Sequence, residues 1–384
     1  MTATAISSTG SHISERVQPD GLWLRNRNWD TLFMTLSVLL VPMPYLFYLI
    51  GMSLGLEKDV ARNGVNLVVA LLVGGPHMYA TFMRTALDDK FVKRYPMLIR
   101  SSVIIPIVVV SLAFLNLTLL LTIFFFWASI HVLHQVTYIV ELYNHRENVE
   151  RNKSAVSLPA RAIDYALILT CLFPIAALKI SQGNFKIGDN DLTKVVPSFF
   201  HAEPGSAPWF FLLMTSLFGI ALVAFIIKSY REWKGGYLNW PKTVFITITV
   251  AVACTMPALD NLDTAFQGLN TWHSFQYLAL TFYIIRLRQQ IGDIESTSPL
   301  VNRIASKANS LRLYIFSSSM IVGSIVLGVT VYFLVGIVDP TRQASARFDT
   351  AYYTAILCFL WIHYYHDHFL FTNFDAVDGP AFGR

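Results

Sequence analysis

Charged residues are scarce in this chain of 384 residues: 14% are Asp, Glu, Lys or Arg, whereas 54% are hydrophobic. Because soluble domains carry about 25% charged residues, this composition excludes an ordinary soluble protein and indicates an integral membrane protein. Apolar stretches of about 20 residues, enough to cross the hydrocarbon core of a bilayer, recur about ten times. They lie near residues 31–55, 65–86, 98–114, 117–143, 163–180, 208–228, 242–259, 267–287, 312–337 and 351–373.

Cysteine is also rare. The chain has three, Cys171, Cys254 and Cys358, all inside apolar stretches and none in a CxxC pair. This pattern excludes a disulfide framework and a thiolate metal site. We expect these side chains to pack against neighbouring helices.

The chain lacks a second polar domain and a convincing internal repeat. The opening residues have no apolar segment typical of a cleavable signal peptide. We therefore expect a solvated N-terminal tail over residues 1–30, a single transmembrane helical domain over 31–373 and a C-terminal tail over 374–384. The missing repeat disfavours a transporter built from two matching halves.

Basic residues are distributed unevenly among the predicted loops. Most of the 29 Lys and Arg residues fall in the loops after the second, fourth, sixth and eighth stretches. Because cytoplasmic loops accumulate Lys and Arg, this distribution predicts an all-α bundle of about ten transmembrane helices with both termini cytoplasmic. We expect a bacterial inner membrane or an equivalent membrane. The basic loops favour anionic lipid or an acidic protein as a partner, and not nucleic acid.

Histidines occur where a lipid-spanning segment should have none. The second, fourth, eighth and tenth stretches contain them, and all four run from outside to inside in the predicted topology. At ~1.5 Å per residue, the histidines lie at similar depth. Polar groups at such depth are costly and typical of functional sites. The histidines concerned are His77, His131, His134, His273, His363, His366 and His368.

The spacing of these histidines assigns them to helix faces. His131 and His134 are three residues apart, so they share a face, which continues through Tyr138 to Glu141. His363, His366 and Asp367 also share a face, whereas His368 is rotated from His363 by about 140° at roughly 100° per residue. His368 is therefore the weaker candidate.

Two further features concern single histidines. His77 follows Gly74-Gly75-Pro76, which should loosen the helix and free backbone carbonyls before the histidine. His273 is followed by Gln276 and Tyr277 at helical spacing. His201 lies in a predicted external loop, where we expect a solvated side chain.

The donor types predict which ions fit. Imidazole and carboxylate without thiolate suit Fe, Zn, Cu or Mn, and such a set with open positions suits non-haem iron and oxygen chemistry. Asp367 is either a ligand or a group that orients a ligand imidazole. The predicted donors exceed what one ion usually takes and are enough for two. They are His77, His131, His134, Glu141, His273, His363, His366, Asp367 and His368.

The clusters His131-Val-Leu-His134-Gln and His363-Tyr-Tyr-His366-Asp367-His368 resemble, in kind but not in spacing, those of the polyhistidine membrane di-iron oxygenases: desaturases, hydroxylases and alkane monooxygenases. A looser resemblance is to the retinal-forming membrane carotenoid dioxygenases. The first resemblance implies two non-haem iron ions, O2 as oxidant and a lipid-soluble substrate such as an acyl chain, hydrocarbon or isoprenoid. It also implies a soluble electron donor such as a ferredoxin, for which the segment 90–94 and Arg286 with Arg288 offer a basic dock.

Three other functions remain open at this point. Pairs of the histidines could be axial ligands of a haem. The same residues could form the transit site of a divalent-metal transporter. A structural or assembly factor could hold the histidines in a metal-free, hydrogen-bonded core.

Overall fold

The structure is a computed structural model that describes residues 20–151, 156–187, 190–203, 208–294, 298–305, 310–377 and 379–382. Nearly all of these residues are helical, which confirms the all-α class. The described part of the chain contains two short strands, β1 (Lys186–Ile187) and β2 (Asn190–Asp191), which pair antiparallel in one loop.

The helices follow one another with short connections. The α-helices are α1 (Arg27–Trp29), α2 (Met43–Ser53), α3 (Lys58–Val69), α4 (Gly75–Ala80), α5 (Asp89–Arg94), α6 (Pro96–Ser101), α7 (Ile104–Leu115), α8 (Leu117–Arg151), α9 (Leu158–Thr170), α10 (Phe173–Ser181), α11 (Trp209–Lys234), α12 (Trp240–Ala253), α13 (Leu262–Gln290), α15 (Pro299–Ala305), α16 (Ser310–Ser319), α17 (Ile321–Val338), α18 (Ala344–Thr372) and α19 (Phe374–Val377). Tighter or wider turns are η1 (Asp30–Thr35), η2 (Leu36–Leu40), η3 (Ala70–Gly74), η4 (Thr81–Arg84), η5 (Leu192–Lys194), η6 (Ser198–Phe200), η7 (Met256–Ala258) and η8 (Gly379–Phe382).

Within the described chain, eight helical segments are long and apolar enough to cross a membrane. Each overlaps one of the expected apolar stretches, which supports an integral membrane protein. The segments are Arg27–Ser53, Lys58–Arg84, Pro96–Leu115, Leu117–Arg151, Leu158–Ser181, Trp209–Lys234, Trp240–Ala258 and Ser310–Val338.

The two remaining expected stretches, 267–287 and 351–373, lie inside α13 and α18. Both helices have 29 residues, or about 43 Å at 1.5 Å per residue, and are therefore long enough to span a bilayer. Polar side chains lower their mean hydropathy: Gln267 and Asn270 in α13, and His363 and Asp367 in α18.

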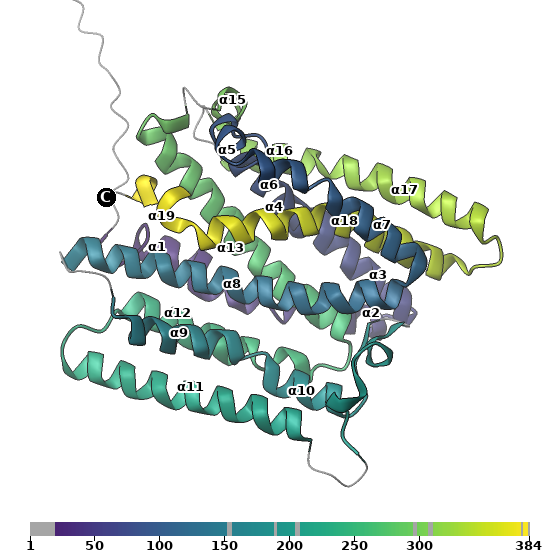
Figure 1. The fold of residues 1–384 in the computed structure, drawn as a ribbon, viewed down its shortest axis with the longest axis horizontal. Helices are drawn as coiled ribbons and strands as arrows, with labels where there is room; N and C mark the ends of the chain where they lie inside the picture. The colour runs from purple at the N-terminus through teal and green to yellow at the C-terminus, as the bar shows by residue number, and fades with distance from the viewer. Residues whose placement is uncertain are drawn as a thin grey trace, which may run out of the picture.

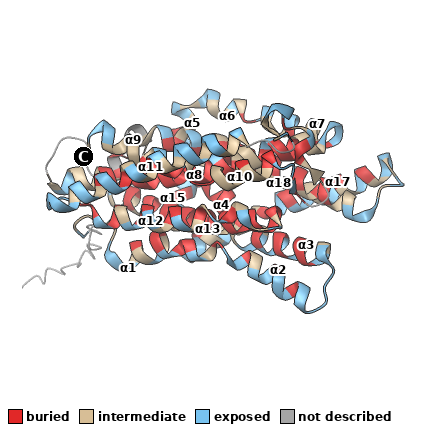
Figure 2. Cartoon of the chain, turned by 90° about the horizontal axis from the view of Figure 1, so that it is seen from below, coloured by how far each residue is buried: buried red, intermediate tan, exposed pale blue. Residues whose placement is uncertain are grey.

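The two polar helices lie in the centre of the bundle. α13 and α18 both contact α8 and α4, and these elements form the middle of the molecule in Figure 1. On one side α7 and α17 pack against α18, and on the other side α9 and α12 pack against α8, with α11 outside α9. Figure 2 shows buried residues concentrated in this middle region and exposed residues on the outer helices. The apolar outer helices thus cover the polar inner ones.

Asn116 separates the third and fourth apolar stretches. Its backbone (φ −158°, ψ 81°) is not helical and ends α7. Its side-chain oxygen accepts a hydrogen bond from the N–H of Leu119 at 3.0 Å, which satisfies one of the free donors at the start of α8. This polar residue therefore forms the boundary that the sequence placed there.

Both expected tails include residues that pack against the bundle. Residues 1–19 of the N-terminal tail lie outside the described residues, but Asp30 at its end is buried and accepts a hydrogen bond from Tyr143 OH at 3.0 Å. In the C-terminal segment, Ala381 is buried in a small cluster with Tyr283 of α13. The ends of α8 and α13 are therefore partly covered by these segments.

Candidate metal centre

The second span has a break in its helix directly before His77. After α3 the chain widens into the π-helical turn η3 and then continues as α4. Pro76 has no N–H to donate to the carbonyl of Leu72, and Tyr314 OH donates to that carbonyl instead, at 2.6 Å. π-turns are frequent at functional sites. The loosened helix expected before His77 is therefore present.

A backbone carbonyl at the end of this turn fixes the orientation of His77. Its Nδ1 donates to the carbonyl oxygen of Gly74 at 2.5 Å, and Ser274 Oγ lies 2.8 Å from the same nitrogen. A neutral imidazole with its N–H at Nδ1 has a lone pair at Nε2. Metal-binding histidines are commonly held by this kind of bond to their second nitrogen. The backbone thus directs the Nε2 lone pair of His77 into the protein.

Four histidines from four helices meet at one buried point. His77 comes from α4, His131 from α8, His273 from α13 and His363 from α18, and each is 3% exposed or less. The ring centroid of His77 lies 4.5 Å from that of His363 and 5.0 Å from that of His273. The ring centroid of His131 lies 5.0 Å from that of His363 and 4.9 Å from that of His273. Each imidazole therefore has two others as neighbours.

The closest pair of nitrogens in this group has the separation expected of two ligands of one metal ion. His77 Nε2 lies 3.0 Å from His363 Nε2. When Thr81 Oγ1 donates its proton to Asp367 Oδ1, 3.0 Å away, it accepts a hydrogen bond from His363 Nδ1 at 2.5 Å. In this tautomer both Nε2 atoms present lone pairs to the same point. Nitrogens bound to one metal ion at ~2.1 Å lie roughly 3.0–3.4 Å apart, which fits this separation.

The other two imidazoles have nitrogens that nothing nearby satisfies. His131 Nε2 and both ring nitrogens of His273 are buried without a hydrogen-bond partner among the described residues. Leaving a buried polar group unsatisfied costs about 1–3 kcal/mol. Several such nitrogens directed at one point fit a bound cation, which would take up their lone pairs.

A carboxylate lies beside the four imidazoles. Asp367 Oδ1 accepts a hydrogen bond from Tyr277 OH at 2.7 Å, and Asp367 Oδ2 lies 4.0 Å from His131 Nε2 and 3.5 Å from His363 Nδ1. Both roles expected of this residue, ligand or orienting group, agree with these positions.

Two overlapping sets of three residues have the spacing needed to hold a metal ion. In each set, one ligand atom per residue lies within 4.8 Å of the others. The sets are His77 with His273 and His363, and His131 with His363 and Asp367. His363 belongs to both. We call these five residues the buried centre.

His366 lies outside the buried centre. Its Nδ1 is 3.0 Å from Thr85 Oγ1 and its Nε2 is 2.8 Å from Ser102 Oγ. Both ring nitrogens are therefore occupied by hydroxyl groups. The sequence placed His366 on one face with His363, but a separation of three residues leaves about 60° between them at roughly 100° per residue, and that angle turns His366 toward α6 and its end.

Glu141 is also distant from the buried centre and has other partners. Its carboxylate accepts hydrogen bonds from Arg161 Nε at 2.9 Å and from Tyr165 OH, both on α9. The carboxylate is thus compensated by a neighbouring helix. Glu141 instead lines a separate cavity between α8, α9 and α18.

His134 and His368 meet each other in that same cavity. Their ring centroids are 5.1 Å apart, and both side chains line the cavity, whose volume is about 780 Å³. His368 is exposed and His134 half-buried. The structure thus divides the nine expected donors into five at the buried centre, two in this cavity, and two with other partners.

Several residues that support the centre were not among the expected site residues. Thr81 bridges His363 and Asp367, and it lies four residues after His77, on the same helix face. Ser274 adjoins His273 in sequence and contacts His77. The ring of Tyr364 stacks on His131 at 4.1 Å. Helical spacing from the histidines would have suggested Thr81; nothing in the sequence indicated the stacking of Tyr364.

A small cavity of about 40 Å³ adjoins His77, between α4, α13 and α18. A cavity needs roughly 10–15 Å³ to hold one water molecule, so this space fits a few waters or a diatomic molecule. An apolar groove of about 410 Å³ between α4, α17 and α18 shares part of its lining with this cavity. The shared residues are Ala70, Gly75, Met78, Tyr352 and Ile356.

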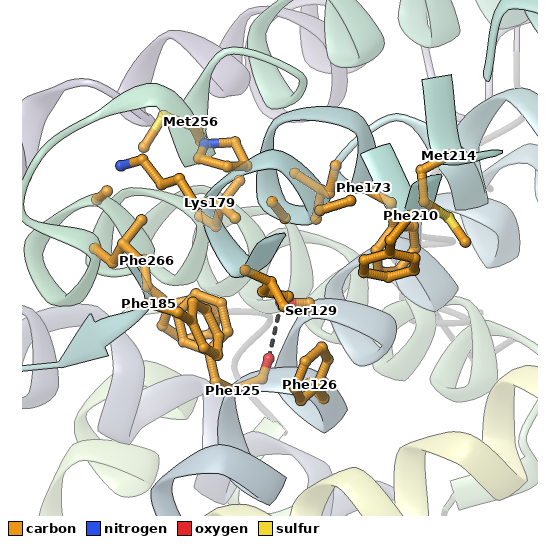
Figure 3. Close-up of a pocket in the computed structure, with 18 residues that line it drawn as sticks. Phe125, Phe126, Ser129, Phe173, Lys179, Phe185, Phe210, Met214, Met256 and Phe266 are labelled. Atoms are coloured by element: carbon orange, nitrogen blue, oxygen red, sulfur yellow. Dashed lines mark hydrogen bonds between the residues drawn. The ribbon is translucent and has the colours of Figure 1, made fainter. Parts of the chain in front are cut away.

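A second apolar pocket, of about 240 Å³, lies on the other side of α13. Figure 3 shows phenylalanines from several segments around it, with Lys179 beside Met256 and with Phe210 and Met214 at the opposite side. Lys179 Nζ donates to the carbonyl of Leu259 at 2.5 Å. Phe266 lines both this pocket and the cavity at His77, and its ring therefore separates them.

Part of the expected basic dock is engaged within the protein. Lys90 Nζ lies 2.6 Å from Asp293, and Arg288 lies 2.7 Å from both Asp293 and Asp88. Burial opposes ionisation of Asp293, but its bonds to Lys90 and Arg288 outweigh this and hold its pKa below the ordinary value. These basic residues thus tie α5 to the end of α13.

No protein-family model, curated protein or solved structure matches this chain. The geometry of the buried centre is therefore the basis for a functional conclusion.

Proposed function

We propose that this chain is a membrane-embedded oxidoreductase that holds a non-haem iron ion at the buried centre and uses O2 to oxidise a lipid-soluble substrate. The observation that carries the proposal is the closed group of four buried imidazoles, in which His131 Nε2 and both ring nitrogens of His273 have no hydrogen-bond partner among the described residues. A divalent cation satisfies such a group better than any arrangement of the few available protons.

The geometry favours one ion over the two expected from the sequence. Five donors converge, and His363 belongs to both sets of potential ligands. The residues that would have supplied a second ion have other partners or lie elsewhere: His366 between two hydroxyls and Glu141 beside Arg161. Four imidazoles and one carboxylate match the ligand number of a single ion with an open position.

Bound iron with an open position would supply the activation of O2. The residues of the chain provide orientation and protons. Thr81 and Gly74 hold His363 and His77 in the tautomers that present Nε2 to the ion. Tyr277 OH donates a hydrogen bond to Asp367 Oδ1 at 2.7 Å, and it also lies 2.7 Å from Thr81 Oγ1. These three groups can hold a proton next to the reacting substrate.

The apolar groove beside the buried centre supports a lipophilic substrate. The groove is lined by outward-facing residues of α17 and reaches, through shared lining residues, the cavity at His77. In a membrane this groove would open toward lipid. An acyl chain, hydrocarbon or isoprenoid entering sideways would meet the centre without passing through water.

The proposed topology has ten spans, with α13 and α18 as the two central ones and both termini cytoplasmic, in a bacterial inner membrane or an equivalent membrane. The uneven distribution of basic residues supports this orientation. Membrane lipid surrounds the outer helices, and a soluble donor such as a ferredoxin would deliver electrons from the cytoplasmic side.

A haem is disfavoured by the nitrogen positions. Two axial nitrogens on opposite sides of a haem iron would be roughly 4 Å apart with the macrocycle between them. His77 Nε2 and His363 Nε2 are 3.0 Å apart, so no macrocycle fits between them.

The test is elemental analysis and absorption spectroscopy of the detergent-purified full chain. We expect about one iron per chain and no Soret band. His131→Ala and His363→Ala should each remove the bound iron while the protein stays folded, because each deletes a donor from the buried centre. His201→Ala is the matched control, since His201 lies in the loop after η6, half-buried and not solvated as expected from the sequence, and is not part of the buried centre; it should keep the wild-type iron content.

Full iron retention in both His131→Ala and His363→Ala would overturn the proposed site. A Soret band would indicate haem. Zinc or manganese that is lost on dialysis and taken up by proteoliposomes would indicate a transporter instead of an oxidoreductase.

A further inference from the structure

His134 and His368 were expected at the metal site, but they form a separate pair. They lie on α8 and α18, the helices that also supply His131 and His363 to the buried centre. Their ring centroids are 5.1 Å apart. Two imidazoles at this separation can bind one divalent ion in common.

The pair lies in an open cavity on the outside of the bundle. The cavity has a volume of about 780 Å³ and is lined by polar residues that include Asn144, His145 and Asn148. His368 is exposed. This cavity therefore gives a hydrated ion access to the two imidazoles, whereas the residues of the buried centre are 3% exposed or less.

The carboxylate in the cavity is already engaged. Glu141 accepts hydrogen bonds from Arg161 and Tyr165, so its negative charge is compensated. Two imidazoles without a carboxylate bind a divalent ion more weakly than the five donors of the buried centre. An ion bound at the pair would thus gain ligands by moving inward.

One aromatic ring lies between the pair and the buried centre. The ring centroid of Phe371 is 5.3 Å from His134 and 6.0 Å from His131, and the ring stacks on Tyr138 at 4.7 Å. His131 and His134 are themselves one helical turn apart on the same face of α8. A rotation of the Phe371 side chain would therefore connect the two sets of imidazoles.

The opposite side of the buried centre offers a poorer route for a cation. The cavity at His77 is only about 40 Å³. Its carboxylate, Asp263, accepts a hydrogen bond from Asn66 at 2.9 Å and lies 3.7 Å from the guanidinium of Arg62. The carboxylate is thus already engaged by Asn66 and Arg62, and the small volume of the cavity limits the passage of a hydrated ion.

We propose that His134 and His368 form a loading site, which binds a divalent cation such as ferrous iron from solution and passes it to the buried centre past Phe371. The inference rests on the proposed function, since it requires the buried centre to hold a metal ion. It gives a role to the two histidines that the buried centre does not include.

The test measures how fast metal-free, full-length protein takes up metal. Co²⁺ is the probe, because its visible absorption reports tetrahedral or five-coordinate binding, and a stopped-flow trace gives the rate. We expect the His134→Ala/His368→Ala double variant to load about tenfold more slowly than wild type. The final Co²⁺ content per chain should be unchanged, since the five ligands of the buried centre remain.

Three further variants make the result interpretable. His145→Ala is the matched control, because His145 lines the same cavity and its ring lies 5.4 Å from that of Phe374; if the pair alone binds the ion, this variant loads at the wild-type rate. His368→Ala alone changes an exposed residue and should slow loading without affecting folding. Phe371→Ala should accelerate loading by removing the ring between the two sites.

A double variant that loads as fast as wild type would overturn the loading site while leaving the proposed function intact. A lower final Co²⁺ content in the double variant would also overturn it, because the pair would then be part of the final site. Wild-type protein that binds no metal would instead contradict the proposed function itself.

Discussion

The residues that orient the imidazoles matter for metal binding as well as the imidazoles themselves. His77 is fixed by the carbonyl of Gly74 at the start of α4, and His363 is fixed by the hydroxyl of Thr81. Neither the Gly74 carbonyl nor the Thr81 hydroxyl is among the proposed metal ligands. Both determine which ring nitrogen presents its lone pair to the buried centre, and they should therefore affect metal affinity.

Thr81→Val tests this role of the hydroxyl. Valine has nearly the same shape but cannot accept the proton of His363 Nδ1 or donate to Asp367. We expect metal affinity to fall by about 10–100-fold, the usual effect of losing such an orienting partner. Competition titration with a chelator measures the affinity, and thermal unfolding confirms that the variant is folded.

Thr247→Val is the control for the preceding change. Thr247 is exposed on α12 and its hydroxyl donates only to the carbonyl of Thr243 at 2.8 Å. Metal affinity should be unaffected there. Equal affinities of wild type and Thr81→Val would show that Thr81 does not orient His363.

At the residue scale, the sequence predicted a group of buried histidines but not which of them come together. Their position inside predicted spans identified all four histidines of the buried centre. The Gly-Pro pair before His77 indicated the broken helix. The division among helix faces could not be predicted, because it depends on which helix lies opposite. Glu141 is an example: its partner Arg161 is on the next helix, and no pattern within α8 shows that α9 brings a guanidinium to this position.

At the element scale, α13 must approach its neighbours very closely to bring His273 to the buried centre. Gly268 lies where α13 crosses the end of η2, and a Cβ atom at this position would overlap the carbonyl oxygen of Val41. The glycine is needed there because the contact is with backbone, which cannot rotate away as a side chain can.

Gly268→Ala should therefore destabilise the protein, although alanine is normally the better helix residue. Forcing an extra methyl group into a close contact costs about 1–3 kcal/mol, so the unfolding temperature in detergent should fall. Gly219→Ala on α11 is the matched control, because no atom lies within 4 Å of its added Cβ. That variant should be as stable as wild type or slightly more stable. Equal unfolding temperatures for both variants would contradict the close packing of α13 against Val41.

The ten apolar stretches could be located from hydropathy because membrane helices are long and uniform. Most of the irregular parts could not. The Gly-Pro pair indicated the break at η3, but no sequence signal indicated the π-turn η1, the 3₁₀ turn η4 or the bond from Tyr314 to the carbonyl of Leu72. The pairing of β1 with β2 could not be predicted either, because the sequence of this loop has no strong strand pattern.

At the scale of the whole molecule, the two polar helices α13 and α18 determine whether the bundle has eight or ten spans. Eight helical segments of the described chain are apolar enough to cross the membrane, and α13 and α18 are not among them. With eight spans or with ten, both termini lie on the same side of the membrane. A measurement on either side of α13 and α18 themselves is therefore needed to distinguish the two arrangements.

Labelling on either side of each polar helix can distinguish the two arrangements. Asp260 and Ile291 are exposed residues at the two ends of α13, and Gln343 and Thr372 are exposed at the ends of α18. In a variant without its native cysteines, single cysteines at these positions would react with a membrane-impermeant maleimide in sealed right-side-out vesicles only if they face outward.

We expect cysteines at positions 260 and 343 to be labelled from outside and those at 291 and 372 only after the vesicles are opened. The reason is that the buried centre needs histidines from α4, α8, α13 and α18 at one depth, and helices that stop at the membrane surface would not bring His273 and His363 there. Cysteines in place of Phe199 and Lys234, at either end of the apolar helix α11, calibrate the two sides. If both ends of α13 or of α18 react from the same side, that helix does not span the membrane, and the centre would have to lie at the membrane surface, within reach of water-soluble substrates.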